Sequence, residues 1–192
     1  MKYFKTFESF LFEANGKPVV FFPGRFQPFH TGHLEALKRT ADAFRLSVVA
    51  VQIVSQREES PFPTDLLEKM GNEVKRANRF IEDFIIYPPG EKTFLGFIIE
   101  HLQEKGYDPV GMGCGSDRFN DYLKQVAYMN KPTSEVKISP DFEVKMVDSR
   151  SSGGPSGTRV REALKNDDQK EFDQLMPREL HKFYNEMKKY TK

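Results

Sequence analysis

The fold of this chain is decided at residues 19–34, which read VVFFPGRFQPFHTGHL. The apolar run 19–22 is typical of a buried strand, and apolar residues at helical spacing follow from Leu34 onward. Between the two lies a turn rich in Gly, Pro and His. Because open α/β sheets bind ligands beyond the carboxyl ends of their strands, this turn is where we expect a functional site.

The same alternation of strand and helix patterns continues along the chain. It indicates βαβ units, and therefore an α/β fold with an open, mostly parallel five-stranded sheet and helices on both faces. Thr64 is expected to cap the second helix, and Gly106 to stop the third. Further strands are predicted at 46–54, 83–87, 109–114 and 143–147, and helices at 34–44, 64–80, 93–105 and from 116 through Val126.

A length of 192 residues fits one domain over residues 1–192. Residues 166–192 are predicted to form a helical C-terminal region that Pro177 breaks in two. Residues 1–16 are predicted to form a short helical extension that packs on the body, with a docking or assembly tag as the alternative. Its apolar residues at helical spacing are Phe4, Phe7, Phe10 and Leu11.

Composition narrows the classes of protein to consider. The 29 Lys and Arg nearly balance the 28 Asp and Glu, which excludes a chain drawn to nucleic acid by its total charge. No apolar run approaches the roughly 18 residues of a membrane span. The single cysteine, Cys114, excludes an internal disulfide and a multi-Cys metal cluster. We therefore expect a cytoplasmic protein without nucleic-acid or membrane partners; a homo-oligomer stays possible.

The turn after the first strand has the composition of a phosphate-binding site. His30 and His33 are three apart at a helix start, so their imidazoles face the same way. Gly32 lets a ligand approach the backbone, the first helical turn offers N–H groups, and Arg25 adds a positive fork suited to phosphate oxygens. Two histidines could also bind zinc, but zinc sites take three or four ligands, and no Cys lies near these two residues in sequence. We expect phosphate and no metal ligands.

These residues also carry a family resemblance. GRFQPFHTGH, residues 24–33, resembles the HxGH signature of the nucleotidylyltransferase superfamily, and its GRFQP lead-in most resembles nicotinamide-mononucleotide adenylyltransferases of the archaeal type. SGTRVR, residues 156–161, is similar to the second signature, SGTxxR. SPFP, residues 60–63, is similar to the NPF-containing helix entry of these enzymes, although Thr64-Asp65 stands where an Arg often follows.

The resemblance implies a Rossmann-like sheet and direct transfer of a nucleotidyl group, without a covalent enzyme intermediate. It makes His30, His33 and Arg161 the catalytic residues and implies Mg²⁺ carried with the nucleoside triphosphate. Gly115-Ser116-Asp117 is similar to a strand end that contacts ribose in relatives, although Asp117 could merely cap the following helix. The nucleotide-binding residues implied are Gly24, Arg25, Phe26, Gly32, Gly115, Asp117, Ser156, Gly157 and Thr158.

The expected reaction is ATP plus nicotinamide mononucleotide giving NAD and pyrophosphate. The alternative within the enzyme class is a cytidylyltransferase, with CTP as substrate, or another adenylyltransferase acting on a phosphorylated alcohol. A non-catalytic nucleotide-binding module is a further alternative. The loop Ser149–Gly157 has little apolar side chain to anchor it, so we expect it to be mobile and to close over the leaving pyrophosphate.

Overall fold

The computed structural model describes residues 16–54, 61–87, 94–134, 138–139, 141–147 and 154–191. The predicted N-terminal helix lies outside these residues, as does Ser60 of the proposed helix entry. Among the helices described, none is long and apolar enough to cross a membrane.

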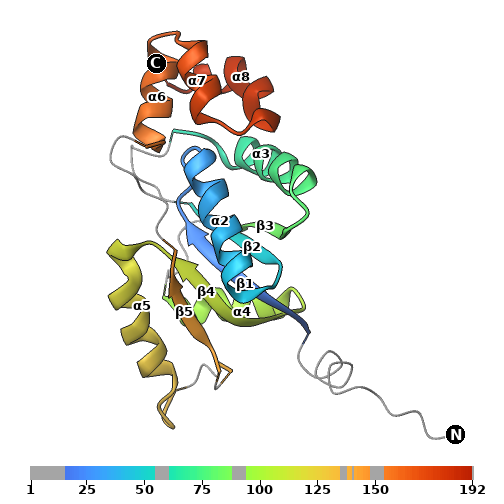
Figure 1. Cartoon of the computed structure of the whole chain (residues 1–192), viewed down its shortest axis with the longest axis vertical. Helices are drawn as coiled ribbons and strands as arrows, with labels where there is room; N and C mark the ends of the chain where they lie inside the picture. Colours follow the sequence, from blue (N-terminus) through green and yellow to red (C-terminus); the bar gives the residue numbers. More distant parts are fainter. Residues whose placement is uncertain are drawn as a thin grey trace, which may run out of the picture.

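Within the described ranges, five strands form one sheet in the order β3-β2-β1-β4-β5, and every pairing is parallel. This confirms the predicted parallel α/β sheet. After the first strand, the second and third strands are added on one side of it. The chain then crosses back, and the fourth and fifth strands are added on the other side (Figure 1). The strands are β1 (Lys17–Gly24), β2 (Val48–Ile53), β3 (Ile81–Tyr87), β4 (Tyr107–Cys114) and β5 (Glu143–Met146).

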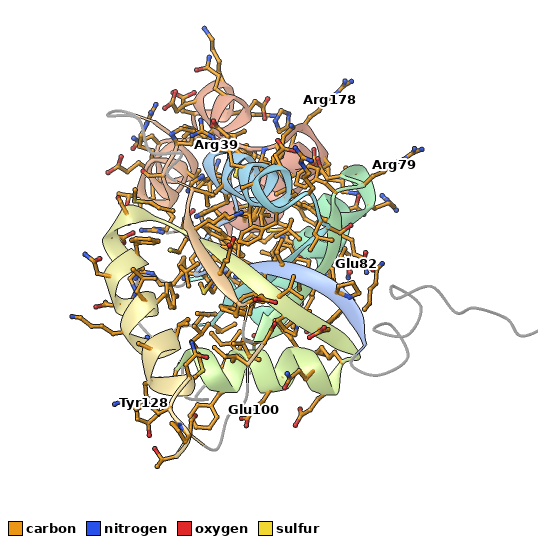
Figure 2. All side chains as sticks on the ribbon, turned by 60° about the horizontal axis from the view of Figure 1, so that its bottom comes forward. Arg39, Arg79, Glu82, Glu100, Tyr128 and Arg178 are labelled. Atoms are coloured by element: carbon orange, nitrogen blue, oxygen red, sulfur yellow. The ribbon has the colours of Figure 1, made fainter. Side chains whose placement is uncertain are left out.

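Helices cover both faces of the sheet, as predicted. Alternate β1 side chains enter different cores: Val20 and Phe22 belong to one cluster, Val19 and Phe21 to the other. The first cluster is covered by the helices at 31–44 and 64–77, and the second by those at 95–104 and 116–129 (Figure 1). Figure 2 shows Arg39 on the first side, and Glu100 and Tyr128 on the other. These helices are α2 (Thr31–Phe44), α3 (Thr64–Ala77), α4 (Leu95–Glu104) and α5 (Ser116–Met129).

The C-terminal region is helical and packs on the same core as α2 and α3. Pro177 separates two of its helices, as predicted, but an earlier break occurs at residues 166–168. There Asp167 adopts a left-handed conformation, and the Asp168 side chain accepts the Glu171 N–H at 2.9 Å to start the next helix. The elements are α6 (Gly157–Lys165), α7 (Gln169–Leu175), the 3₁₀ helix η1 (Arg178–Phe183) and α8 (Tyr184–Lys188).

The boundaries of α3 differ from the prediction. The helix starts at Thr64, but Pro63 occupies the N-cap position and no side chain caps it, so the capping role expected of Thr64 was wrong. It ends at Ala77 rather than Phe80, because Asn78 leaves the helix and donates from its side chain to the Val74 carbonyl at 2.8 Å. After α4, Gly106 adopts a positive φ of 83°, which confirms the predicted stop.

One glycine of β4 sets how closely α2 approaches the sheet. A Cβ added at Gly113 would overlap the Thr40 hydroxyl and lie 2.9 Å from the Thr40 methyl carbon. We therefore expect Gly113→Ala to lower the free energy of unfolding by about 1–3 kcal/mol through overpacking. Urea denaturation measures this loss. The double variant Thr40→Ala/Gly113→Ala should recover part of it; strictly additive losses would contradict the contact.

Candidate active site

The two histidines of the first signature lie together at the start of α2. His30 is the N-cap residue and His33 the third residue of the helix. Their rings stack, with centroids 3.6 Å apart. The backbone N–H of His30 donates to Nδ1 of His33 at 3.3 Å. Because Nδ1 accepts this bond, a neutral His33 carries its proton on Nε2, where the ring can act as a hydrogen-bond donor.

His30 is 7% exposed, and burial lowers the pKa of its imidazole to about 4. The ring is therefore neutral near pH 7, with one donor and one acceptor nitrogen. Its Nδ1 and both side-chain amide atoms of Gln27 are buried without a hydrogen-bond partner among the described residues. Such groups cost about 1–3 kcal/mol each until a partner arrives, and they accumulate at functional sites.

The aromatic ring of Phe26 packs against the His33 ring. Its ring is 1% exposed and lies edge-on to His33, with centroids 4.8 Å apart, and edge-on to Phe29 at 5.3 Å. Its backbone is left-handed, with φ of 41°. A Cβ at Gly24 would overlap this ring, so glycine is required there for packing. The Phe26 ring is thus buried among other aromatic rings, and the predicted contact of Phe26 with nucleotide stays a prediction.

The second signature, residues 156–161, lies in contact with the loop that carries the first signature. Ser156 caps α6 by accepting the Arg159 N–H at 3.2 Å. Arg161, one turn further on, donates from Nη1 to the Gln27 carbonyl at 2.6 Å and from Nη2 to the Thr158 hydroxyl at 3.3 Å. A Cβ at Gly157 would come within 2.7 Å of that same Gln27 carbonyl. Glycine therefore allows α6 to start directly against residues 25–30, the loop that leads into the HxGH signature and is called the HxGH loop below.

Gly115 and Asp117 lie at the same edge of the sheet, on the strand next to β1. Met112 of β4 pairs with Phe21 of β1, so Gly115 is level with Gly24. Gly115 is the N-cap of α5, and Asp117 is an exposed residue of the first turn. The N-cap position is therefore held by Gly115 and not by Asp117, and ribose contact by Asp117 stays a prediction. Burial, with the nearby Asp117 charge, raises the Cys114 pKa to about 11, which agrees with a packing role.

The electrostatics of this edge favour an anion. Helices α2, α5 and α6 all begin there, on the side to which the strand arrows point (Figure 1). Helix N-termini carry unsatisfied N–H groups and a partial positive charge. Arg25 is exposed beside them. Among the described residues, no group of three His, Cys, Asp or Glu could hold a metal ion. The helix N–H groups and the Arg25 guanidinium suit phosphate oxygens.

The structure brings every predicted site residue to this one edge and adds two that we had not singled out. The first is Gln27, whose backbone carbonyl receives Arg161. The second is Gln52, a buried amide in β2. Its signal in the sequence was a polar residue inside the apolar run LSVVAVQIV. Residues 148–153, most of the loop expected to close over pyrophosphate, lie outside the described residues.

Comparison with known proteins agrees with this geometry. Residues 21–84 match the family described as cytidylyltransferase-like. The phosphopantetheine adenylyltransferase of Arthrobacter sp. (strain FB24) is 31% identical over 115 residues, which are 60% of this chain and 67% of that enzyme. The chain belongs to the cytidylyltransferase-like family of nucleotidylyltransferases. The family resemblance drawn from the two signatures is thereby confirmed.

Other members extend the comparison. The phosphopantetheine adenylyltransferase of Leptospira biflexa (strain Patoc 1 / Ames) is 26% identical over 127 residues, covering 66% of this chain and 71% of that enzyme. A solved structure of Plasmodium falciparum nicotinic acid mononucleotide adenylyltransferase, complexed with NaAD, superposes with a TM-score of 0.60. It shares 14% identity and covers 91% of this chain and 98% of its own. This likeness shows that the chain has a Rossmann-like fold.

The lowered pKa of His30 predicts that the free energy of unfolding depends on pH. The unfolded chain binds a proton at His30 near pH 6.5, whereas the folded chain binds it only near pH 4, so stability falls as the pH drops through this window. At pH 5 the loss from this residue is about 2 kcal/mol relative to pH 7. We expect His30→Gln to remove most of that loss in urea denaturation at the two pH values.

The matched control for this experiment is His181, on η1, whose side chain contacts the Met176 carbonyl at 3.0 Å. His181→Gln should keep the acid-dependent loss of stability seen in the wild type. If His30→Gln and His181→Gln lose equal stability between pH 7 and pH 5, His30 is not the buried neutral group described above.

Proposed function

We propose that this enzyme transfers the adenylyl group of ATP to the phosphate of a small phosphorylated acceptor, with release of pyrophosphate. The observation that carries the proposal is the 2.6 Å contact between Arg161 and the Gln27 carbonyl. It sets the SGTxxR helix against the HxGH loop, which supports a single binding site formed by both signatures. A module that only binds nucleotide would not need the two stacked histidines in that site.

In the proposed reaction, an oxygen of the acceptor phosphate attacks the α-phosphorus of ATP. The bond from that phosphorus to the bridging oxygen breaks, and pyrophosphate leaves with the electron pair. His33 donates from Nε2–H, and His30 acts as a neutral partner beside it, where negative charge builds on the α-phosphate and bridging oxygen. Arg161, Ser156 and Thr158 hold the β- and γ-phosphates. Catalysis is then positioning and charge stabilisation.

Magnesium enters this proposal as part of the substrate. Mg²⁺ binds phosphate oxygens and keeps several of its water ligands, so it needs few protein ligands when it travels with a triphosphate. The donors at the site, which are imidazole, guanidinium and helix N–H groups, complement the phosphate oxygens of such a complex.

The proposed acceptor is nicotinamide mononucleotide. Support comes from the GRFQP lead-in of residues 24–28. The second candidate is phosphopantetheine, the acceptor named in the sequence relatives at 26–31% identity. Phosphopantetheine is a phosphorylated alcohol, so it also belongs to the alternative class that the sequence left open. Both acceptors present a phosphate monoester to the same ATP, and the reaction at the α-phosphorus is identical.

A pyrophosphate-release assay that crosses ATP and CTP with the two acceptors tests this proposal. We expect release with ATP and nicotinamide mononucleotide, and none when magnesium is chelated. Faster release with ATP and phosphopantetheine would replace the first acceptor with the second. Release only with CTP would overturn adenylyl transfer, and no release with any combination would overturn the proposed reaction itself.

Removing one donor at the reacting phosphate should slow turnover strongly. We expect His33→Ala to lower kcat at least ~100-fold, with a smaller change in the apparent affinity for ATP, because a preorganised donor contributes about 2.7–4 kcal/mol at the transition state. Steady-state kinetics with the productive pair of substrates measure both quantities. His181→Ala, far along the C-terminal region, should retain wild-type turnover; near-wild-type turnover of His33→Ala would assign His33 a structural role.

A further inference from the structure

One buried polar side chain of the sheet has no role in the reaction as proposed so far. Gln52 lies in the apolar strand β2 and is 1% exposed. Burying an amide without hydrogen bonds is costly, so its partners are informative. Its Nε2 donates to the carbonyl of Arg25 at 3.2 Å and to the carbonyl of Phe26 at 3.3 Å. Both acceptors belong to the HxGH loop.

The position of Gln52 explains how it reaches this loop. In the pairing of β1 with β2, Gln52 lies opposite Gly24, the last residue of β1. Beyond Gly24 the chain leaves the sheet, and Phe26 takes its left-handed conformation. The carbonyls of the next two residues therefore lie past the end of the β1–β2 ladder, and the Gln52 side chain continues the hydrogen bonding that the backbone no longer supplies.

Three successive carbonyls of the loop are then held by two side chains from distant parts of the chain. Gln52 holds those of Arg25 and Phe26, and Arg161 holds that of Gln27. The Phe26 ring in turn contacts His33, so the Gln52 amide is linked to the reacting donor through one residue.

From these contacts the geometry points to Gln52 as a positioning residue of the nucleotidyl-transfer site. It does not touch substrate; it fixes the backbone that aims the Arg25 guanidinium and the His33 imidazole. The kinetic part of this inference rests on the proposed function, whereas the fixing of the loop does not. Because misplacing a reacting group by about 1 Å can cost 100-fold in rate, loss of this support should appear in kcat.

The test uses Gln52→Met, which keeps the length and volume of the side chain and removes the amide. The matched control is Thr40→Val, since Thr40 is also fully buried and donates to a backbone carbonyl, that of Ala36 at 2.9 Å, away from the loop. We expect Gln52→Met to lower kcat about tenfold or more while the KM for ATP changes less than about threefold. Thr40→Val should keep the kcat of the wild type.

Hydrogen exchange in the ligand-free protein gives a readout that needs no activity. The amides of residues 25–27, 29 and 30 should exchange about tenfold faster in Gln52→Met than in the wild type or Thr40→Val. Gln52→Glu adds a further readout, because only its protonated carboxyl can donate to a carbonyl. Its kcat relative to the wild type should therefore rise as the pH falls.

The outcomes separate the two proposals. Unchanged exchange and unchanged kcat in Gln52→Met would overturn the positioning role and leave the proposed reaction standing. Faster exchange of these loop amides, in a protein whose wild type releases no pyrophosphate with any substrate pair, would overturn the reaction and leave the loop support standing. Equal losses of kcat in Gln52→Met and Thr40→Val would assign Gln52 a general packing role and overturn the inference.

Discussion

The central strand β1 is paired on both edges and buried on both faces, and the rest of the molecule depends on this constraint. β2 and β4 flank it, and its alternate side chains enter separate cores. Because β1 is paired on both edges and packed on both faces, its carboxyl end has a fixed position. The residues that follow β1 are therefore also fixed in position. The chain also reverses its direction of sheet growth between β1 and β4, which opens the crevice where ligands of such sheets bind.

Most hydrogen-bond donors at this crevice are neutral groups or carry only the partial charge of a helix N-terminus, and few carry a full charge. His30 is kept neutral by burial, His33 is oriented by a backbone N–H, and three helix N-termini supply partial charges. Groups of this kind need no counter-charge from the protein, and they do not reorganise when negative charge builds on a substrate. Arg25 and Arg161 add full charge at the edge, where solvent moderates its cost. This division agrees with the proposed substrate, a triphosphate that carries its own Mg²⁺.

Local patterns in the sequence predicted the local structure well. The apolar runs 46–54 and 109–114 correspond to β2 and β4, and Gly106 ends its helix as expected. The start of α3 was misassigned because a residue that can cap is also an acceptable first helical residue, and only the extended backbone of Pro63 decides between them. The contacts of Gln27 with Arg161 and of Gln52 with the loop join residues far apart in sequence, so no local pattern could reveal them. The sequence nevertheless showed Gln52 as a polar residue inside an apolar strand.

The Thr31 hydroxyl, on the first residue of α2, donates to the Leu175 carbonyl at 2.9 Å, and Arg161 makes its own contact from α6. The last helices of the chain thus close the structure around a loop that lies near its beginning. During synthesis, which proceeds from the N-terminus, both histidines leave the ribosome well before residues 161–175, so they lack these partners until those residues follow. A chain that stops before α6 would therefore hold both histidines without the contacts that Arg161 and Leu175 make with this region.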